Sequence, residues 1–250
     1  MKRIPLFFLL AMSPLNAQDN TSSQTAVEQL LPSQKEFLNL PEDQRKEFIT
    51  HFSEASRYFQ QKRIFETLEA LDKAEKVFVN SAELWNLKGS CYVEMRAFDK
   101  ATAAFAKALE LNPENVSIQF NIAEVYFVTK QWQKANDLFE EILKKTDPKN
   151  TSLGRLVEFK ILLGKIKLGL ENEVQILAEK YDYLDDSPYY YYSQAALAYE
   201  KEDLLAAEEW LARANRIFRD PNILAPWQDT LVEFGYIKSF YGEPDTSPSE

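Results

Sequence analysis

The side chains that most often do chemistry in proteins are scarce in this chain. It has 250 residues but only one histidine, His51, and one cysteine, Cys91. A zinc site normally needs three or four histidine or cysteine ligands, so we predict no metal site. A cysteine nucleophile needs a base beside it, so His51 and Cys91 would have to meet in space. We instead expect Cys91 to be a small buried packing residue and His51 an ordinary exposed or half-buried one.

Carboxylates are plentiful, but their spacing does not favour acid–base catalysis. The adjacent pairs are Glu140-Glu141, Asp185-Asp186 and Glu208-Glu209. Neighbouring residues on a helix point in different directions, so the two members of a pair do not face each other. The sequence also lacks a glycine-rich phosphate loop and a Gly-x-Ser-x-Gly nucleophile motif. We therefore expect no catalytic residue, no cofactor and no enzymatic activity.

The charge balance excludes one large class of partner. The chain carries 39 acidic and 29 basic residues, a formal net charge of −10. Without a local basic cluster, such a protein repels phosphate backbones, and anionic lipid surfaces repel it for the same reason. We therefore expect no nucleic-acid partner. No apolar run outside the N-terminal segment approaches the length of a membrane span, so we expect no membrane insertion of the mature chain.

A pattern of small and aromatic residues between Ala82 and Asn115 indicates how the chain is organised. Its members are Trp85, Gly89, Tyr92, Ala101, Phe105, Ala108 and Pro113. Trp85, Leu87 and Tyr92 lie on one side of a first helix. Phe105, Ala108 and Leu109 lie on one side of a second. Gly89 and Ala101 are small where the two helix axes must approach closely. Pro113 ends the second helix. A lone helix pair of this kind cannot bury both apolar faces, so similar pairs should flank it.

Similar units do recur at a spacing of 34 residues. Residues 116–149 repeat the pattern with Ala123, Tyr126, Ala135 and Phe139, and residues 48–81 repeat it more weakly. Another match covers 188–221. Residues 150–187 fill the remaining gap as a degenerate unit whose register the sequence does not assign.

This pattern resembles the tetratricopeptide repeat family, whose unit is a 34-residue helix–turn–helix. The resemblance implies an all-α, right-handed α-solenoid of about five repeats over residues 41–241, with a helix that opens at Pro41 and a capping helix over 226–241. Residues 242–250 form an acidic tail that we expect to be disordered.

In proteins similar to this one, the first helix of each repeat lines a concave groove. The residues that this places in the groove are Phe52, Phe59, Asn86, Val93, Glu94, Phe120, Glu124, Phe127, Tyr192 and Tyr199. Exposed aromatic rings often mark recognition surfaces. The alternative is that these rings pack against neighbouring first helices. Some relatives hold the carboxylate of a chaperone tail with Lys, Asn and Arg, and Asn86 resembles one such asparagine. Glu94 and Glu124 would repel an acidic tail, so an extended apolar or basic peptide, or a helix, fits better.

Two other functions stay open at this point. The run Tyr189–Tyr192 points around more than one helical turn, and exposed tyrosines there would suit the stacking of sugars in a glycan or cell-wall binding module. A secretion chaperone would also have acidic repeats, but such proteins usually stay in the cytosol.

The N-terminal segment predicts export. Lys2 and Arg3 precede a short apolar stretch that ends in small residues, the pattern of a secretory signal peptide over residues 1–17 with cleavage after Ala17. Residues 18–40 are expected to be a flexible leader. The mature chain would then be periplasmic or secreted, as a non-catalytic adaptor or assembly scaffold for a protein or peptide partner in the bacterial cell envelope. The sequence identifies neither that partner nor the oligomeric state.

Overall fold

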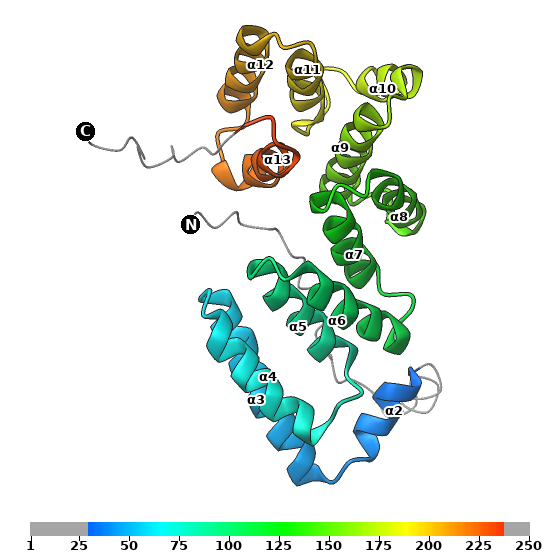
Figure 1. Cartoon of the computed structure of the whole chain (residues 1–250), viewed down its shortest axis with the longest axis vertical. Helices are drawn as coiled ribbons and strands as arrows, with labels where there is room; N and C mark the ends of the chain where they lie inside the picture. The colour runs from blue at the N-terminus through cyan, green and yellow to red at the C-terminus, as the bar shows by residue number, and fades with distance from the viewer. Residues whose placement is uncertain (1–29, 238–250) are drawn as a thin grey trace, which may run out of the picture. The chain divides into compact units, whose positions relative to one another are not determined.

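The computed structural model describes residues 30–237, and all the regular secondary structure in this part of the chain is helical (Figure 1). Its helices are α2 (Pro32–Asn39), α3 (Glu42–Gln60), α4 (Ile64–Val77), α5 (Ala82–Glu94), α6 (Phe98–Leu111), α7 (Val116–Val128), α8 (Trp132–Lys145), α9 (Thr151–Lys167), α10 (Glu171–Ala178), α11 (Tyr189–Glu200), α12 (Leu204–Ile217) and α13 (Pro221–Phe234). The expected all-α class and helical-repeat architecture are confirmed.

The described residues belong to two compact units that meet in sequence within α7. Residues 30–125 lie in the first, called here the N-terminal unit, and residues 126–237 lie in the second, the C-terminal unit. Consecutive helices pack side by side within each unit, as α3 with α4, α5 with α6, and α11 with α12 do. None of the described helices combines the length and the apolar character that crossing a lipid bilayer requires.

Every turn between the two helices of a pair contains one residue in the left-handed conformation. These residues are Lys62, Arg96, Lys130, Gly169 and Glu202, with φ between 57° and 70°. The amide of Arg96 donates to the carbonyl of Val93 at 2.7 Å, and Lys62 makes the same contact with Phe59 at 2.9 Å. This conformation reverses the chain in few residues, and only one of the five positions has the glycine that adopts it without strain.

Gly89 shows why the repeat needs a small residue in its first helix. A Cβ atom added there would lie 2.5 Å from the ring of Phe105, which is fully buried on α6. The two helices of this pair therefore approach to a distance that excludes a side chain at residue 89.

The region expected to be a flexible leader contains a helix in its described part. Residues 32–39 form α2, with Pro32 at its first turn. The ring of Phe37 lies 5.2 Å from that of Phe48 and 5.4 Å from that of Phe78, so α2 extends the core of the N-terminal unit. The expectation of flexibility failed here because Phe37 and Leu40 find apolar partners that the sequence alone does not place. Residues 18–29 and the signal peptide over 1–17 lie outside the described residues.

The degenerate unit consists of a long helix, α9, and a short one, α10. After α10 the chain runs as turns to Ser187, and ionic contacts hold this segment to α9. Lys180 contacts the Glu158 carboxylate at 2.7 Å, and Arg155 contacts Asp185 at 3.2 Å. The longer α9 and these contacts replace the regular second helix that the sequence does not supply.

The last described helix begins and ends earlier than the capping helix that the sequence predicts. Asp220 caps the start of α13, Pro221 occupies its first position, and the chain leaves the helix at Gly235 with φ 95°. Glycine takes this left-handed conformation readily, so the helix stops there. Residues 238–241 of the predicted helix, and the tail 242–250, lie outside the described residues.

Candidate protein-binding faces

The residues predicted for a groove lie on the first helices, but most of them are buried. Phe52 and Asn86 are half-buried. The buried side chains are Phe59, Val93, Phe120, Glu124, Phe127, Tyr192 and Tyr199, and the Glu94 side chain is only 5% exposed. The rings whose contacts are described therefore pack between helices, which is the alternative that the sequence left open.

In the N-terminal unit, α5 and α7 bring two asparagine amides together. Asn121 Nδ2 donates a hydrogen bond to Asn86 Oδ1 at 2.9 Å. This contact fixes the orientation of the Asn86 amide, because its oxygen is already an acceptor and its nitrogen must point elsewhere. Asn121 is fully buried, and its own Oδ1 accepts no hydrogen bond from any residue in the described range.

Asn121 is a site residue that the sequence reasoning missed. Phe120 has the same position in its repeat as Asn86 has in the preceding one, and Asn121 is the next residue along the chain. Its signal was a polar residue among the apolar residues of α7, where burial of a polar group without a partner is costly, but Gln119 and Glu124 of the same helix give the same signal.

The Glu94 carboxylate is paired with a basic side chain. Lys62 Nζ lies 2.7 Å from Glu94 Oε1, and the same ammonium lies 5.7 Å from the centre of the Phe59 ring. The ion pair joins the turn after α3 to the end of α5. It therefore offsets much of the repulsion that the sequence predicts between Glu94 and an acidic ligand.

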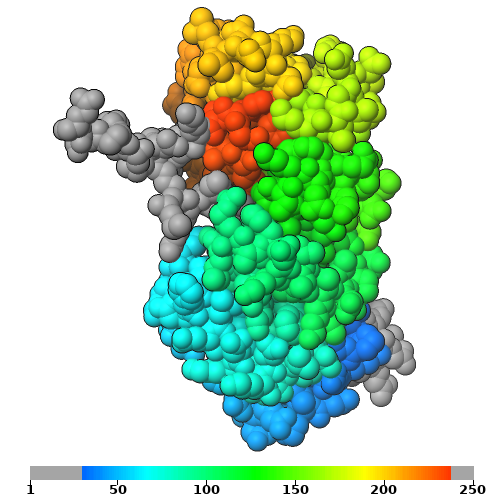
Figure 2. Space-filling model, in the orientation of Figure 1, coloured from blue at the N-terminus to red at the C-terminus, as the bar shows by residue number. Residues whose placement is uncertain are grey.

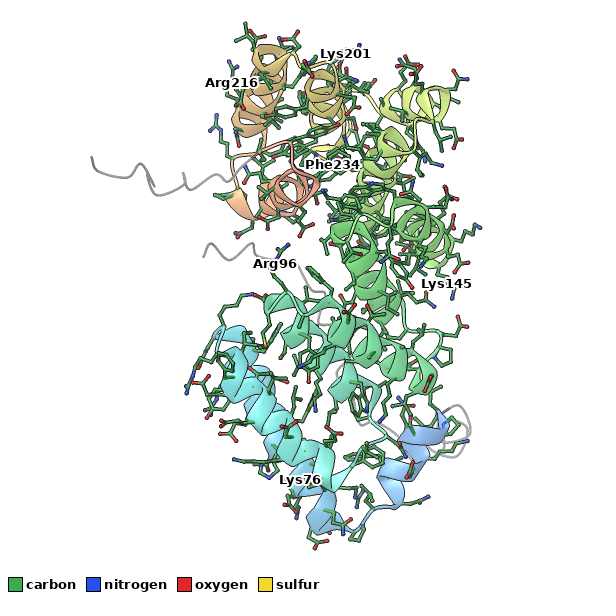
Figure 3. All side chains as sticks on the ribbon, viewed as in Figure 1. Lys76, Arg96, Lys145, Lys201, Arg216 and Phe234 are labelled. Carbon is green, nitrogen blue, oxygen red and sulfur yellow. The ribbon has the colours of Figure 1, made fainter. Side chains whose placement is uncertain are left out.

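In the C-terminal unit, α13 covers the side chains that were expected to line the groove. The ring of Phe234 stacks on Phe127 at 5.9 Å and also lies 5.3 Å from Trp132. Figure 3 labels Phe234 on α13. Trp227, on the same helix, lies 5.6 Å from Tyr192. Figure 2 shows α13 in red beside the gold surface of α11 and α12 and the yellow-green surface of α10.

Polar contacts also hold α13 against the other helices of the C-terminal unit. Lys160 Nζ on α9 lies 3.5 Å from Glu233 Oε2, and both side chains are buried. Just after the helix, the Tyr236 ring stacks on Tyr199 at 5.1 Å, and its hydroxyl donates to Glu200 at 2.8 Å. Burial and the Glu200 carboxylate raise the pKa of Tyr236, so this phenol stays protonated and keeps donating.

The tyrosine run is not an exposed platform for sugars. Tyr189, Tyr191 and Tyr192 are buried, and Tyr190 is half-buried with its ring 5.7 Å from that of Trp210. The Tyr189 hydroxyl donates to the Leu177 carbonyl at 2.9 Å, which ties α11 to the end of α10. These rings build the core of the C-terminal unit.

The two candidate nucleophilic side chains have unrelated surroundings. Cys91 is fully buried in the apolar core of the N-terminal unit, and that burial, together with the charge of Glu94, raises the pKa of its thiol to about 12. His51 lies in a shallow depression with Gln44, Glu47 and Lys73. Among the residues that the structure describes, no three His, Cys, Asp or Glu side chains are grouped so as to hold a metal ion.

Comparisons with known proteins agree with this geometry. Residues 82–115 match the family described as "Tetratricopeptide repeat". A curated relative, Tetratricopeptide repeat protein 37 of Xenopus laevis, is 28% identical over 144 residues, which are 58% of this chain. The match spans only 8% of the length of that much longer protein.

Two solved structures have a similar fold. YrrB, described as a TPR protein with an unusual peptide-binding site, superposes with a TM-score of 0.51 at 19% identity, over 77% of this chain and 95% of its own. A mutant of MamA gives 0.50 at 16% identity, over 68% of this chain and 96% of its own. At these identities the likeness concerns the fold alone. Residues 82–115 therefore match a tetratricopeptide repeat, and the chain as a whole has a helical-repeat fold similar to that of YrrB.

Proposed function

We propose that this chain is a non-catalytic adaptor or assembly scaffold that binds an extended peptide on the first helices of its N-terminal unit. Proteins built from tetratricopeptide repeats generally mediate protein–protein interactions, which is the broad class that the family match supports. The peptide-binding site named in the description of YrrB belongs to a protein of similar fold and is consistent with the same use of the repeat.

The observation that carries this proposal is the fixed amide of Asn86. Its oxygen accepts from Asn121, and no residue in the described part of the chain accepts a hydrogen bond from the side-chain nitrogen of this half-buried asparagine. A donor that is held in one orientation loses little further entropy on binding, which suits the carbonyl of a peptide backbone. Extended peptides offer such carbonyls along their whole length, whatever their side chains.

A substitution at this residue separates recognition from packing. Asn86→Asp keeps an oxygen that accepts from Asn121 but replaces the donor nitrogen with an acceptor. We expect the variant to melt close to the wild type and to capture its partner at least about tenfold less, because a lost hydrogen bond to ligand costs on the order of 1–1.5 kcal/mol and an acceptor facing a carbonyl adds repulsion.

The partner can be trapped with a photo-crosslinking amino acid at residue 86. The matched control places the same group at Ala103, an exposed position on α6, the second helix of the same pair. Illumination in envelope extract should give a discrete adduct from residue 86 and none from residue 103. Equal labelling at both positions, or undiminished capture by Asn86→Asp, would overturn the proposed site.

The place of action that we propose is the bacterial cell envelope, and its support is the sequence of residues 1–17. Cleavage after Ala17 would leave Gln18 as the first residue of the mature protein. Mass spectrometry of the N-terminus, together with cell fractionation, tests this directly. An intact Met1 in the cytosolic fraction would refute export.

A further inference from the structure

A turn between α10 and α11 presents two large apolar side chains to solvent (Figure 1). Tyr183 is 63% exposed and its neighbour Leu184 is 72% exposed. Single exposed apolar residues are common on protein surfaces, but two large ones side by side form a surface suited to contact with another protein. The turn that carries them is called here the 181–186 turn.

Contacts with α9 fix the inner side of the 181–186 turn. The guanidinium carbon of Arg155 lies 3.6 Å from the centre of the Tyr181 ring, and the Arg155 Nε and Nη2 atoms each donate to Asp185 Oδ2 at 3.2 Å. Across the tip, the Leu184 amide donates to Asp182 Oδ1 at 2.9 Å. The exposed side chains therefore extend from an ordered backbone, so a ligand that binds them pays little for ordering the turn.

The outer side of the turn has the same residue types as the inner side but lacks a basic partner. On the inner side, one tyrosine and one aspartate together hold Arg155. On the outer side, Tyr183 is accompanied by two exposed aspartates, Asp182 and Asp186. Within residues 30–237, no lysine or arginine side chain pairs with either of these aspartates. A guanidinium stacks on aromatic rings, pairs with carboxylates and is weakly hydrated, so this set suits an arginine better than a lysine.

We propose that the outer side of the 181–186 turn is a second protein-binding surface, whose ligand is a partner segment with an arginine beside an apolar side chain. The guanidinium lies on the Tyr183 ring and pairs with the carboxylates of Asp182 and Asp186. The neighbouring apolar side chain covers Leu184. The formal net charge of −10 on the chain favours the approach of such a basic segment. This surface shares no residue with the site proposed around Asn86, so either proposal can fail while the other stands.

A short peptide tests the assigned ligand chemistry on the unmodified full-length chain. The capped tripeptide Leu-Arg-Leu is titrated into isotopically labelled protein, and the amide chemical shifts of residues 182–186 should change and saturate. The matched probe has citrulline in place of arginine, which keeps the planar group but removes its charge, and it should bind at least about fivefold more weakly. Equal binding of the two peptides would overturn the proposal. Shift changes around Asn86 alone would support the site in the N-terminal unit and overturn this one.

Two substitutions on the turn test the groups assigned to the arginine. Tyr183→Leu removes the aromatic ring but keeps an apolar side chain, and it should weaken binding of Leu-Arg-Leu at least about fivefold. Asp186→Asn removes one carboxylate at nearly constant size and should also weaken binding, most clearly at low salt. Asp137→Asn, which makes the same charge change at an exposed residue of α8, is the control and should bind like the wild type. Undiminished binding by both turn variants would contradict the assignment.

A second copy of this chain is the alternative occupant of the surface, and dilution distinguishes it from a separate partner. Without peptide, the amide shifts of residues 182–186 should not depend on the concentration of the chain. If they do depend on it, the turn contacts another copy, and the assignment to a separate partner is wrong.

Discussion

Cys91 lies among apolar side chains of α5 and its neighbours, and its chemistry follows from that position. Burial raises the pKa of the thiol to about 12, so at pH 8 only about one molecule in ten thousand carries the reactive thiolate. We expect iodoacetamide to leave the native protein unlabelled at pH 8 and to label it fully in concentrated urea, as read by mass spectrometry. Rapid alkylation of the folded chain would show that α5 opens often enough to expose this core.

Two glycines on α9 differ sharply in the space around them. A Cβ atom at Gly164 would lie 2.1 Å from Oδ1 of Asn136, a buried side chain that donates to the Ile161 carbonyl, whereas a Cβ atom at Gly154 meets nothing within 4 Å. Gly164→Ala should therefore destabilise the protein by about 1–3 kcal/mol, because Asn136 loses its place and its hydrogen bond.

Gly154→Ala is the matched substitution in the same helix. It should stabilise the protein by about 0.5–1 kcal/mol through helix propensity. Urea denaturation of both variants measures the difference, and two equal effects would contradict the close approach of α8 and α9.

At the scale of the element, periodicity predicted the helices of the regular repeats well. The pattern from Trp85 to Pro113 predicted the positions of α5 and α6, because the size of each of its residues suits only one register of the repeat. Sequence reasoning failed where partners come from elsewhere in the chain. α2 packs through Phe37 on Phe48, and the segment after the short α10 contacts Glu158 of α9 through Lys180.

The sequence also did not predict the left-handed turn residues, because Lys, Arg and Glu have no particular preference for that conformation. Arg96 has φ 57° between α5 and α6. A side chain there costs about 1 kcal/mol, which glycine avoids. Arg96→Gly should therefore be about 1 kcal/mol more stable than Arg96→Ala, a variant that loses the same side chain but keeps a Cβ atom. Thermal unfolding of the pair measures this, and an Ala variant as stable as the Gly variant would argue against the turn geometry.

At the scale of the whole molecule, the sequence predicted which residues lie on first helices but not what covers them. Tyr192 and Phe127 are at the offset of groove residues, and no local pattern reveals that Trp227 and Phe234, far along the chain, pack on them. Pairing of this kind depends on where a helix docks after the array ends, which a repeat period does not encode. The sequence did not predict Asn121 as a site residue for a related reason, because its hydrogen-bond partner Asn86 lies on another helix.

A repeat array transmits a local defect poorly, because each repeat contacts only its neighbours. Phe37 packs on Phe48 and Phe78 at one end of the N-terminal unit, so Phe37→Ala removes ring contacts worth about 2 kcal/mol there. Leu38→Ala is the control on the same helix, since Leu38 is 47% exposed and should have almost no effect. Hydrogen exchange should then accelerate in α3 and α4 of the Phe37 variant and stay unchanged in α11 and α12. Uniform acceleration through every helix would mean that the chain unfolds as one cooperative body, and stability could no longer be assigned repeat by repeat.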